Sequence, residues 1–240
     1  MKAMIFSAGL GTRFKPWTDH HPKALALVNG KSLLQRNIEY LQQHGIREVV
    51  VNVHHFADQI ESAIQASNGW GSKVYISDER EEVLETGGGL LKAESLLGTQ
   101  RLVTCNVDIL TDLDISKLIG FHEANRPLIS FGVTNRPSSR QFLFNRSMQL
   151  CGWKNNSTGE VRMSRDEHEL TPLSYSCVVV FEPEIFPLMR KHGFTGKFSL
   201  TDVYLRLASE HQILGFDHSG DRFIDVGKPE AVEKAQALFR

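Results

Sequence analysis

The chain has 240 residues, of which 41% are hydrophobic, so it can bury a sizeable core as one α/β domain over residues 1–240. Its 27 lysines and arginines nearly balance its 28 aspartates and glutamates, and the formal net charge of -1 gives no overall field that would recruit nucleic acid or an anionic membrane. Three cysteines without metal-ligand spacing, and an apolar start too short for a signal peptide or a membrane span, predict a cytoplasmic protein with free thiols.

The first element is a compact apolar run from Ala3 to Ser7, which is typical of a buried parallel strand that leads into a loop. The segment 6–23 reads F-S-A-G-L-G-T-R-F-K-P-W-T-D-H-H-P-K. Its glycines alone would also fit an ordinary turn, but Arg13 and Lys23 add positive charge where backbone N–H groups can approach an anion. The segment therefore predicts a phosphate-binding loop. Its spacing fits neither a Walker A motif nor the dinucleotide-binding fingerprint.

Helices and strands alternate after this loop. Ser32, with Gln35 three residues later, is typical of a capped helix start, and apolar residues at helical spacing continue until Gly45. The next expected elements are a strand over 48–53, a helix over 56–66 and a strand over 73–77. This βαβαβ alternation implies a parallel sheet with right-handed crossovers, helices on both faces, and ligands beyond the carboxyl ends of the strands.

Three consecutive glycines then occur in the segment 84–91, which reads L-E-T-G-G-G-L-L and precedes a helical pattern that runs to Leu97. Such a run marks either a helix N-terminus or a place where a flat ligand lies on bare backbone, and we favour the ligand. Residues 101–105 form another apolar strand, and Asn106 and Asp108 follow at its carboxyl end, where functional carboxylates are often found.

The pattern changes from Pro127 onward. We expect strands over 128–134, 142–151 and 174–181, a polar loop or hairpin over 155–169, and an inserted sheet region over roughly 127–177. Helices are expected over 183–191 and 200–209, a strand over 212–216, and a very short strand that leads into Asp225. Pro229 opens the last helix.

The segment 6–23 fits G-x-G-T-R-x-x-P followed by P-K, the signature of sugar-1-phosphate nucleotidylyltransferases, and the chain resembles that family from Ala3 to Glu230. The strings L-E-T-G-G-G-L and N-x-D-I-L-T-D-L-D are most similar to N-acetylmuramate 1-phosphate uridylyltransferases and to relatives of mannose-1-phosphate guanylyltransferase. The resemblance implies a Rossmann-like three-layer α/β/α fold with a mostly parallel sheet and a small inserted β lid over the sugar. It also implies condensation of an NTP with a sugar 1-phosphate to an NDP-sugar and pyrophosphate.

The resemblance assigns roles to four charged residues. Arg13 and Lys23 would be the catalytic cations on the phosphates, and Asp108 and Asp225 would ligate one Mg²⁺. The alternatives are a surface arginine paired with Asp19, a solvated lysine, and aspartates that cap helices or turns. The nucleotide would be bound by residues of the first loop, of the triple-glycine segment and of the strand end: Ala8, Gly9, Gly11, Thr12, Thr86, Gly87, Gly88 and Asn106.

The sugar would be bound by Trp153, Lys154, Ser176 and Asp202. Trp153 also fits a buried position in the inserted sheet, and Asp202 also fits an ordinary place at a helix N-terminus. Two departures from the family pattern fall here, because C-G-W-K stands where many relatives have E-K-P and Cys177 stands where many have glycine. The acceptor is therefore expected to differ from glucose-type substrates.

The expected partners are the NTP and the sugar 1-phosphate, without nucleic acid or membrane, in a monomer or a small homo-oligomer. Two other readings share the same loop: a cytidylyltransferase that acts on a non-sugar alcohol phosphate such as phosphocholine, and a sensor that binds an NDP-sugar without turnover. The histidine pairs at 20–21 and 54–55 suit neither a zinc site nor a catalytic triad, so they are expected to make local hydrogen bonds.

Overall fold

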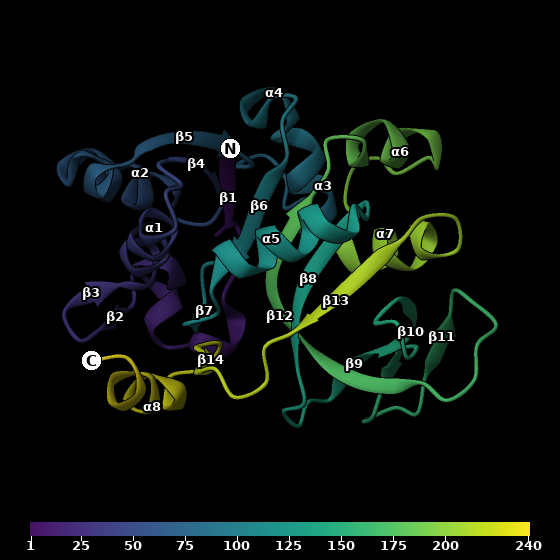
Figure 1. Cartoon of the computed structure of the whole chain (residues 1–240). Coiled ribbons are helices and arrows are strands. Elements are labelled where there is room, and N and C mark those ends of the chain that lie inside the picture. Colours follow the sequence, from purple (N-terminus) through teal and green to yellow (C-terminus); the bar gives the residue numbers. More distant parts are fainter.

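Four parallel strands form the first half of the central sheet in the computed structural model, which describes residues 1–240 (Figure 1). They lie in the order β6-β1-β4-β5, so the first strand is flanked by the second and the fourth. Their bounds are Lys2–Phe6 for β1, Glu48–Val53 for β4, Lys73–Asp78 for β5 and Leu102–Asn106 for β6. The strand order reverses between β1 and β6, which makes their carboxyl ends the expected ligand crevice of such a sheet.

The crossover helices of this half are α1 (Leu33–Gln43) and α2 (Ala57–Ala66), as expected from the sequence. The Ser32 hydroxyl caps α1 by accepting from the Gln35 backbone N–H at 3.1 Å. Three short 3₁₀ turns, over Thr12–Phe14, Trp17–Asp19 and Lys23–Leu25, shape the segment between β1 and α1.

The second half of the sheet is largely antiparallel. Strand β12 (Thr171–Phe181) runs antiparallel to β6 on one side and to β8 (Ile129–Thr134) on the other, and β13 (Ile213–Asp217) runs parallel to β8. The meander of β9 (Arg140–Phe144), β10 (Leu150–Asn155) and β11 (Val161–Met163) continues the same sheet from the start of β12. The result is one ten-stranded mixed sheet.

One expectation for this half is corrected. The segment 142–151 is not one strand, because it contains the end of β9, a turn and the start of β10. Within the segment 127–177 expected as an insertion, β8 is buried along its whole length and is hydrogen-bonded on both sides within the main sheet. Only the β9–β11 meander extends outward, at the end of the sheet farthest from β5 (Figure 1). The hairpin expected over 155–169 is present as the β10–β11 pair.

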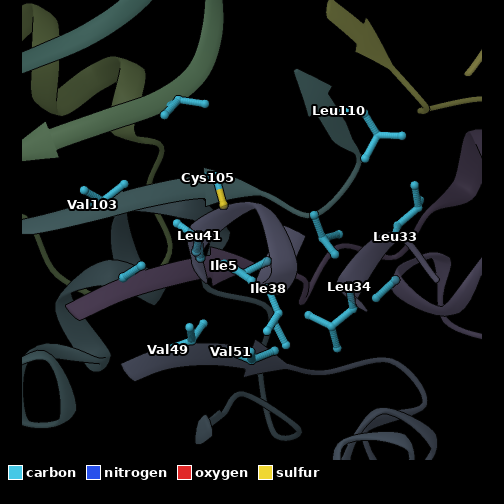
Figure 2. Close-up of a cluster of buried hydrophobic side chains, with 14 of the residues drawn as sticks. Ile5, Leu33, Leu34, Ile38, Leu41, Val49, Val51, Val103, Cys105 and Leu110 are labelled. Carbon is cyan, nitrogen blue, oxygen red and sulfur yellow. The ribbon is translucent and has the colours of Figure 1, made fainter. Parts of the chain in front are cut away.

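Helices cover both faces of the sheet and give the three-layer architecture. On one face, α1, α2, α5 (Ile115–Asn125) and α8 (Glu230–Leu238) contribute to a cluster of 27 buried residues. On the other, α3 (Glu85–Lys92), α4 (Glu94–Leu97), α6 (Ile185–Lys191) and α7 (Leu200–Ala208) contribute to a cluster of 25. Figure 2 shows the apolar side of α1 against the strands of the first face, with Leu34, Ile38 and Leu41 near Ile5, Val49 and Val51. No helix combines the length and the apolar composition that a membrane span requires.

Two small strand pairs lie outside the main sheet. The pair β2 (Leu27–Val28) and β3 (Lys31–Ser32) precedes α1. The pair β7 (Ile109–Thr111) and β14 (Phe223–Asp225) joins the segment after β6 to the segment before α8, so it brings two distant parts of the sequence together.

Candidate active site

A cleft of about 310 Å³ opens at the carboxyl ends of β1 and β6, where the strand order reverses. Backbone and side chains that follow all four parallel strands line it: Phe6, Ser7, Ala8, Gly9, Lys23, Asn52, Glu79, Val83, Glu85, Thr86, Asn106, Val107 and Asp108. The expected residues Ala8, Gly9, Lys23, Thr86, Asn106 and Asp108 are therefore brought together from four separate segments of the sequence.

The first loop needs glycine at one of its two positions. Gly11 has φ +61°, and a Cβ there would lie 2.8 Å from Cγ2 of Thr18, so a side chain would strain the backbone and clash. Thr18 also holds this turn by donating its hydroxyl to the Gly11 carbonyl at 2.9 Å. Gly9 has open space around it, and it lines the cleft. Gly11 and Thr12 do not line the cleft; Gly11 precedes the 3₁₀ turn over Thr12–Phe14.

Lys23 and Asp108 form an ion pair inside this cleft, between Nζ and Oδ2. Their side chains are only 15% and 14% exposed. The pairing rules out an ordinary solvated lysine at position 23, and it places a cation against the strand-end carboxylate.

Asp225, in the C-terminal part of the chain, lies close to Asp108. Asp225 lies opposite Ile109 in the β7–β14 pair, and the next backbone N–H, that of Val226, donates to the Asp108 carbonyl at 2.8 Å. Partial enclosure of the carboxylate and the neighbouring charge of Asp108 raise the pKa of Asp225, although Lys23 and Arg13 oppose this shift. The two expected metal ligands are thus close enough to repel one another electrostatically.

Arg13 lies beside Asp225 on the outer side of this arrangement. A Cβ at Gly227 would be 3.1 Å from Nη2 of Arg13 and 2.6 Å from Oδ1 of Asp225, so both charged groups lie against the bare backbone of Gly227. Arg13 does not pair with Asp19, whose partner is Lys15 at 2.9 Å. Four charged residues predicted from the sequence therefore converge on the end of β6.

A buried polar chain beneath the first loop was missed by the sequence analysis. The Asn52 side chain accepts from the Ser7 N–H at 2.7 Å and donates to Oε1 of Glu79 at 2.7 Å. Glu79 is fully buried, and this burial raises the pKa of its carboxyl. Asn52 interrupts the apolar strand 48–53 and Glu79 follows the next strand, so polar residues at the ends of buried strands were the available signal.

Comparison with known proteins identifies the family. A model of the family described as nucleotidyl transferase matches residues 2–142. The chain is 33% identical to N-acetylmuramate alpha-1-phosphate uridylyltransferase of Caulobacter vibrioides, over 98% of this chain and 95% of that protein. It is 31% identical to the enzyme of the same name from Neisseria meningitidis, over 99% of this chain and 98% of that protein. The chain belongs to the nucleotidyl transferase family.

Solved structures agree with the fold of this nucleotidyltransferase. HddC from Yersinia pseudotuberculosis, complexed with GMP-PN, matches with a TM-score of 0.77 and 22% identity, over 100% of this chain and 99% of that chain. UDP-glucose pyrophosphorylase from Acinetobacter baumanii matches with a TM-score of 0.79 and 18% identity, over 98% of this chain and 91% of that chain. The expected assignment to sugar-1-phosphate nucleotidylyltransferases and to a Rossmann-like layered fold is confirmed, and the protein is an enzyme of this kind rather than a sensor.

The triple glycine of the nucleotidyltransferase has a different explanation from the one favoured by the sequence. All three glycines lie inside α3, and their missing side chains allow close packing. A Cβ at Gly87 would lie 2.4 Å from the Phe198 ring, and one at Gly88 would lie 2.1 Å from the Gly196 carbonyl oxygen. Neither residue lines the cleft, whereas Thr86 does. Gly87 and Gly88 are therefore needed for contact between α3 and the loop before α7, whereas a Cβ at Gly89 would lie 2.7 Å from Oε1 of Glu79.

The residues expected on the sugar side do not form one cavity with the first cleft. Ser176 is fully buried; its hydroxyl is hydrogen-bonded to His218 Nε2 at 2.7 Å and accepts from Arg136 at 3.4 Å. Asp202 pairs with Arg162 at 2.8 Å and also accepts from the Ser199 hydroxyl at the start of α7. Both readings of Asp202, at a helix N-terminus and beside the predicted lid, remain compatible with this position.

Trp153 and Lys154 lie on β10. Trp153 packs against the second buried cluster while remaining half-buried. Lys154 is half-buried opposite Val161 of β11. Cys177 follows Ser176 with φ +59°, a conformation that favours glycine, at the irregularity in the β8–β12 pairing.

The neighbouring histidines make local contacts, as predicted. His54 and Glu79 are joined through Nδ1 and the Glu79 carbonyl at 2.6 Å, and His55 and Thr18 through Nε2 and the Thr18 carbonyl at 3.3 Å. His21 contacts the Gln59 side chain at 3.2 Å. The His55 and His21 contacts join the segment 14–23 to the residues that follow β4.

Proposed function

We propose that the chain transfers a uridylyl group from UTP to N-acetylmuramate 1-phosphate and releases pyrophosphate. The observation that carries this proposal is the end-to-end similarity to two enzymes with that printed activity, which covers 98% and 99% of this chain. Similarity to mannose-1-phosphate guanylyltransferase subunit beta of Danio rerio extends over only 51% of this chain. UTP and N-acetylmuramate 1-phosphate are therefore the preferred pair.

The reaction we infer is an in-line displacement at the α-phosphorus of the nucleotide. A phosphate oxygen of the sugar 1-phosphate forms the new P–O bond, and the bond to the bridging oxygen of pyrophosphate breaks, so the electron pair leaves with pyrophosphate. No covalent bond to the protein is needed, because positioning and charge neutralisation supply most of the catalysis in such transfers. Lys23 would hold the α-phosphate and the attacking phosphate, and Arg13 would hold the departing end.

The carboxylates fit a divalent cation. Asp108 and Asp225 provide two adjacent oxygen ligands whose mutual repulsion a cation would relieve. No group of three or more histidine, cysteine, aspartate or glutamate side chains suited to a metal occurs in the structure, so phosphate oxygens and water would complete the shell, as Mg²⁺ prefers. When bound there, Mg²⁺ would neutralise charge on the transferring phosphates. The NTP itself would lie along the first cleft, between the first loop and Thr86.

The cellular setting follows from the same chemistry. The three cysteines are free in the structure, and the proposed donor is a nucleoside triphosphate. Both fit the reducing cytoplasm expected from the sequence.

A substrate matrix tests the proposed reaction. Pyrophosphate release should be measured for UTP, GTP, CTP and dTTP, each with N-acetylmuramate 1-phosphate, glucose 1-phosphate, mannose 1-phosphate and phosphocholine. We expect the highest kcat/KM for UTP with N-acetylmuramate 1-phosphate, and mass spectrometry should show UDP-N-acetylmuramate. A higher value for GTP with mannose 1-phosphate would replace the proposal by guanylyl transfer.

The phosphocholine arm tests the remaining alternative. A choline-phosphate cytidylyltransferase of Streptococcus pneumoniae is 44% identical, but over only 61 residues and 25% of this chain. We therefore expect no turnover of CTP with phosphocholine. Chelation by EDTA should abolish turnover and Mg²⁺ should restore it, whereas full activity in EDTA would contradict the proposed metal site.

A further inference from the structure

A second cleft, of about 380 Å³, lies where Arg13 and Asp225 face the start of α8. Four other residues that line it are Lys228, Glu230, Ala231 and Lys234. Pro229 and the first turn of α8 place Ala231 and Lys234 three residues apart, on one side of the helix. The small side chain of Ala231 leaves space between the two lysines.

This cleft is lined by three cations, Arg13, Lys228 and Lys234, and by two carboxylates, Asp225 and Glu230. None of the three cations forms an ion pair in the structure, whereas the nearby Lys15 is paired with Asp19. Glu230 lies four residues before Lys234 on α8, at a spacing that allows an ion pair, yet the two are not paired. With Asp225 assigned to the proposed metal, the cations outnumber the remaining carboxylate and predict an anionic ligand with more than one charge.

The position of this cleft matches the geometry of the transfer. Asp108 lines the first cleft and Asp225 lines the second, and the β7–β14 pair holds the two aspartates next to one another. In-line displacement requires that the leaving group depart on the side of the α-phosphorus opposite to the attacking oxygen. A nucleotide in the first cleft, with its α-phosphate near Lys23, would thus extend its terminal phosphates past the aspartates toward Arg13.

We propose that the second cleft binds pyrophosphate, and the β- and γ-phosphates before transfer, through Lys228 and Lys234 in addition to Arg13. Lys228 and Lys234 lie outside the G-x-G-T-R-x-x-P and P-K segments, and no role was predicted for them from the sequence. The proposal requires nucleotidyl transfer, which the family establishes, but it does not depend on which sugar or base the enzyme uses.

The two lysines should strengthen the binding of pyrophosphate and of UTP but not the binding of the UDP-sugar. Pyrophosphate and UTP both carry the terminal phosphates that would occupy the second cleft. A UDP-sugar has only the α-phosphate and the sugar phosphate, both of which belong near Lys23. This difference separates a binding role from a general effect on folding or on the first cleft.

The test is binding of inorganic pyrophosphate, with Mg²⁺, to the wild type and to Lys228→Gln, Lys234→Gln and the double variant by titration calorimetry. Each single variant should weaken binding by roughly tenfold, because one hydrogen bond to a charged group is lost. The KM for pyrophosphate in the reverse reaction should rise in parallel, while the affinity for the UDP-sugar product should change by less than about twofold. Lys117→Gln is the matched control, since Lys117 is an exposed, unpaired lysine on α5.

Wild-type pyrophosphate affinity in the double variant would overturn the proposal, as would an equal loss of affinity in Lys117→Gln. Equal weakening of pyrophosphate and UDP-sugar binding would also overturn it, because the lysines would then act on the site as a whole. If N-acetylmuramate 1-phosphate proves not to be the acceptor, the calorimetric result is unaffected. The two proposals can therefore fail independently.

Discussion

At the scale of single residues, the charge on Lys23 is held in a position where little solvent surrounds it. Its side chain is 15% exposed and is paired with Asp108 in the first cleft. Low exposure strengthens the interaction of a charge with a phosphate, since less water screens it. Lys23 is therefore preorganised for charge that develops during transfer, in contrast to a lysine on the open surface.

Replacement of Lys23 tests this difference directly. Lys23→Gln should lower kcat by about 100- to 1000-fold, the range seen when one preorganised group is removed from a transition state. Lys15→Gln should leave kcat within about twofold, because Lys15 is 62% exposed and paired only with Asp19 in an exposed ion pair. Steady-state kinetics with saturating substrates measure both. A similar loss in the two variants would mean that loop charge in general, and not Lys23, supports the reaction.

Single residues also show which parts of a site can be predicted from the sequence. Arg13, Lys23, Asp108 and Asp225 were predicted because each belongs to a motif or follows a buried strand, and backbone geometry then fixes where it lies. Ser176, predicted on the sugar side, is buried in the structure. A serine at the end of a strand can face a ligand or a buried partner, and here the partner is His218, 42 residues later in the chain. Such a pairing is not visible in the local sequence.

At the scale of elements, α3 shows why Gly87 and Gly88 persist inside a helix. Glycine destabilises a helix interior by about 1 kcal/mol relative to alanine. The loop before α7 approaches α3 so closely that the Phe198 carbonyl accepts from the N–H of Gly87 at 2.9 Å. Close approach of the loop therefore requires glycine despite its low helix propensity, and the loop that explains it lies about a hundred residues away.

Two glycine-to-alanine variants separate packing from propensity. Gly88→Ala should lower the free energy of unfolding by about 1–3 kcal/mol, because its Cβ would lie 2.1 Å from the Gly196 carbonyl oxygen. Gly120→Ala, in α5, should raise it by about 0.5–1 kcal/mol, because nothing lies within 4 Å of its Cβ. Urea unfolding followed by circular dichroism measures both changes. A stabilised Gly88→Ala variant would show that α3 and the loop separate easily.

At the scale of the whole molecule, the sequence predicted the parallel half of the sheet more closely than the antiparallel half. Strands β1, β4 and β5 are joined by nearby helices, so their order follows from short right-handed crossovers. Strand β12 instead pairs with β6, β8 and β9, and β13 pairs with β8, where paired residues such as Ile213 and Ile129 are 84 positions apart. These pairings depend on contacts between distant residues, which is why the local sequence did not predict the strand order of this half.

A buried histidine links the stability of this sheet to pH. His122 on α5 is fully buried and contacts Ser130 of β8 at 2.9 Å and Glu182 at 3.1 Å. Burial lowers the pKa of His122 below its ordinary value of 6.5. The unfolded chain therefore binds more protons than the folded protein below that pH. The contribution of His122 to the free energy of unfolding is therefore fully present above pH 6.5 and is lost as the pH falls from 6.5 toward the lower folded pKa.

The His122→Gln variant should lose part of this pH dependence. Between about pH 7.5 and 5.5, the slope of the free energy of unfolding against pH should decrease by up to about 1.4 kcal/mol per unit relative to the wild type. The exposed His168→Gln variant should keep the wild-type slope. Urea titrations at several pH values give these slopes. An unchanged slope in His122→Gln would show that His122 binds a proton equally well in the folded and unfolded states.

The ion pair between Lys23 and Asp108 would link the binding of the proposed cation to the binding of the nucleotide. Before any ligand arrives, Lys23 already occupies an oxygen of Asp108 that the proposed cation needs. In the proposed reaction, a nucleotide phosphate would draw Lys23 away and the cation would in turn free Lys23 for the phosphate, so each ligand would raise the affinity for the other by the same factor. Free Mg²⁺ alone would thus bind weakly, and the Mg²⁺–nucleotide complex would be the species that the enzyme captures.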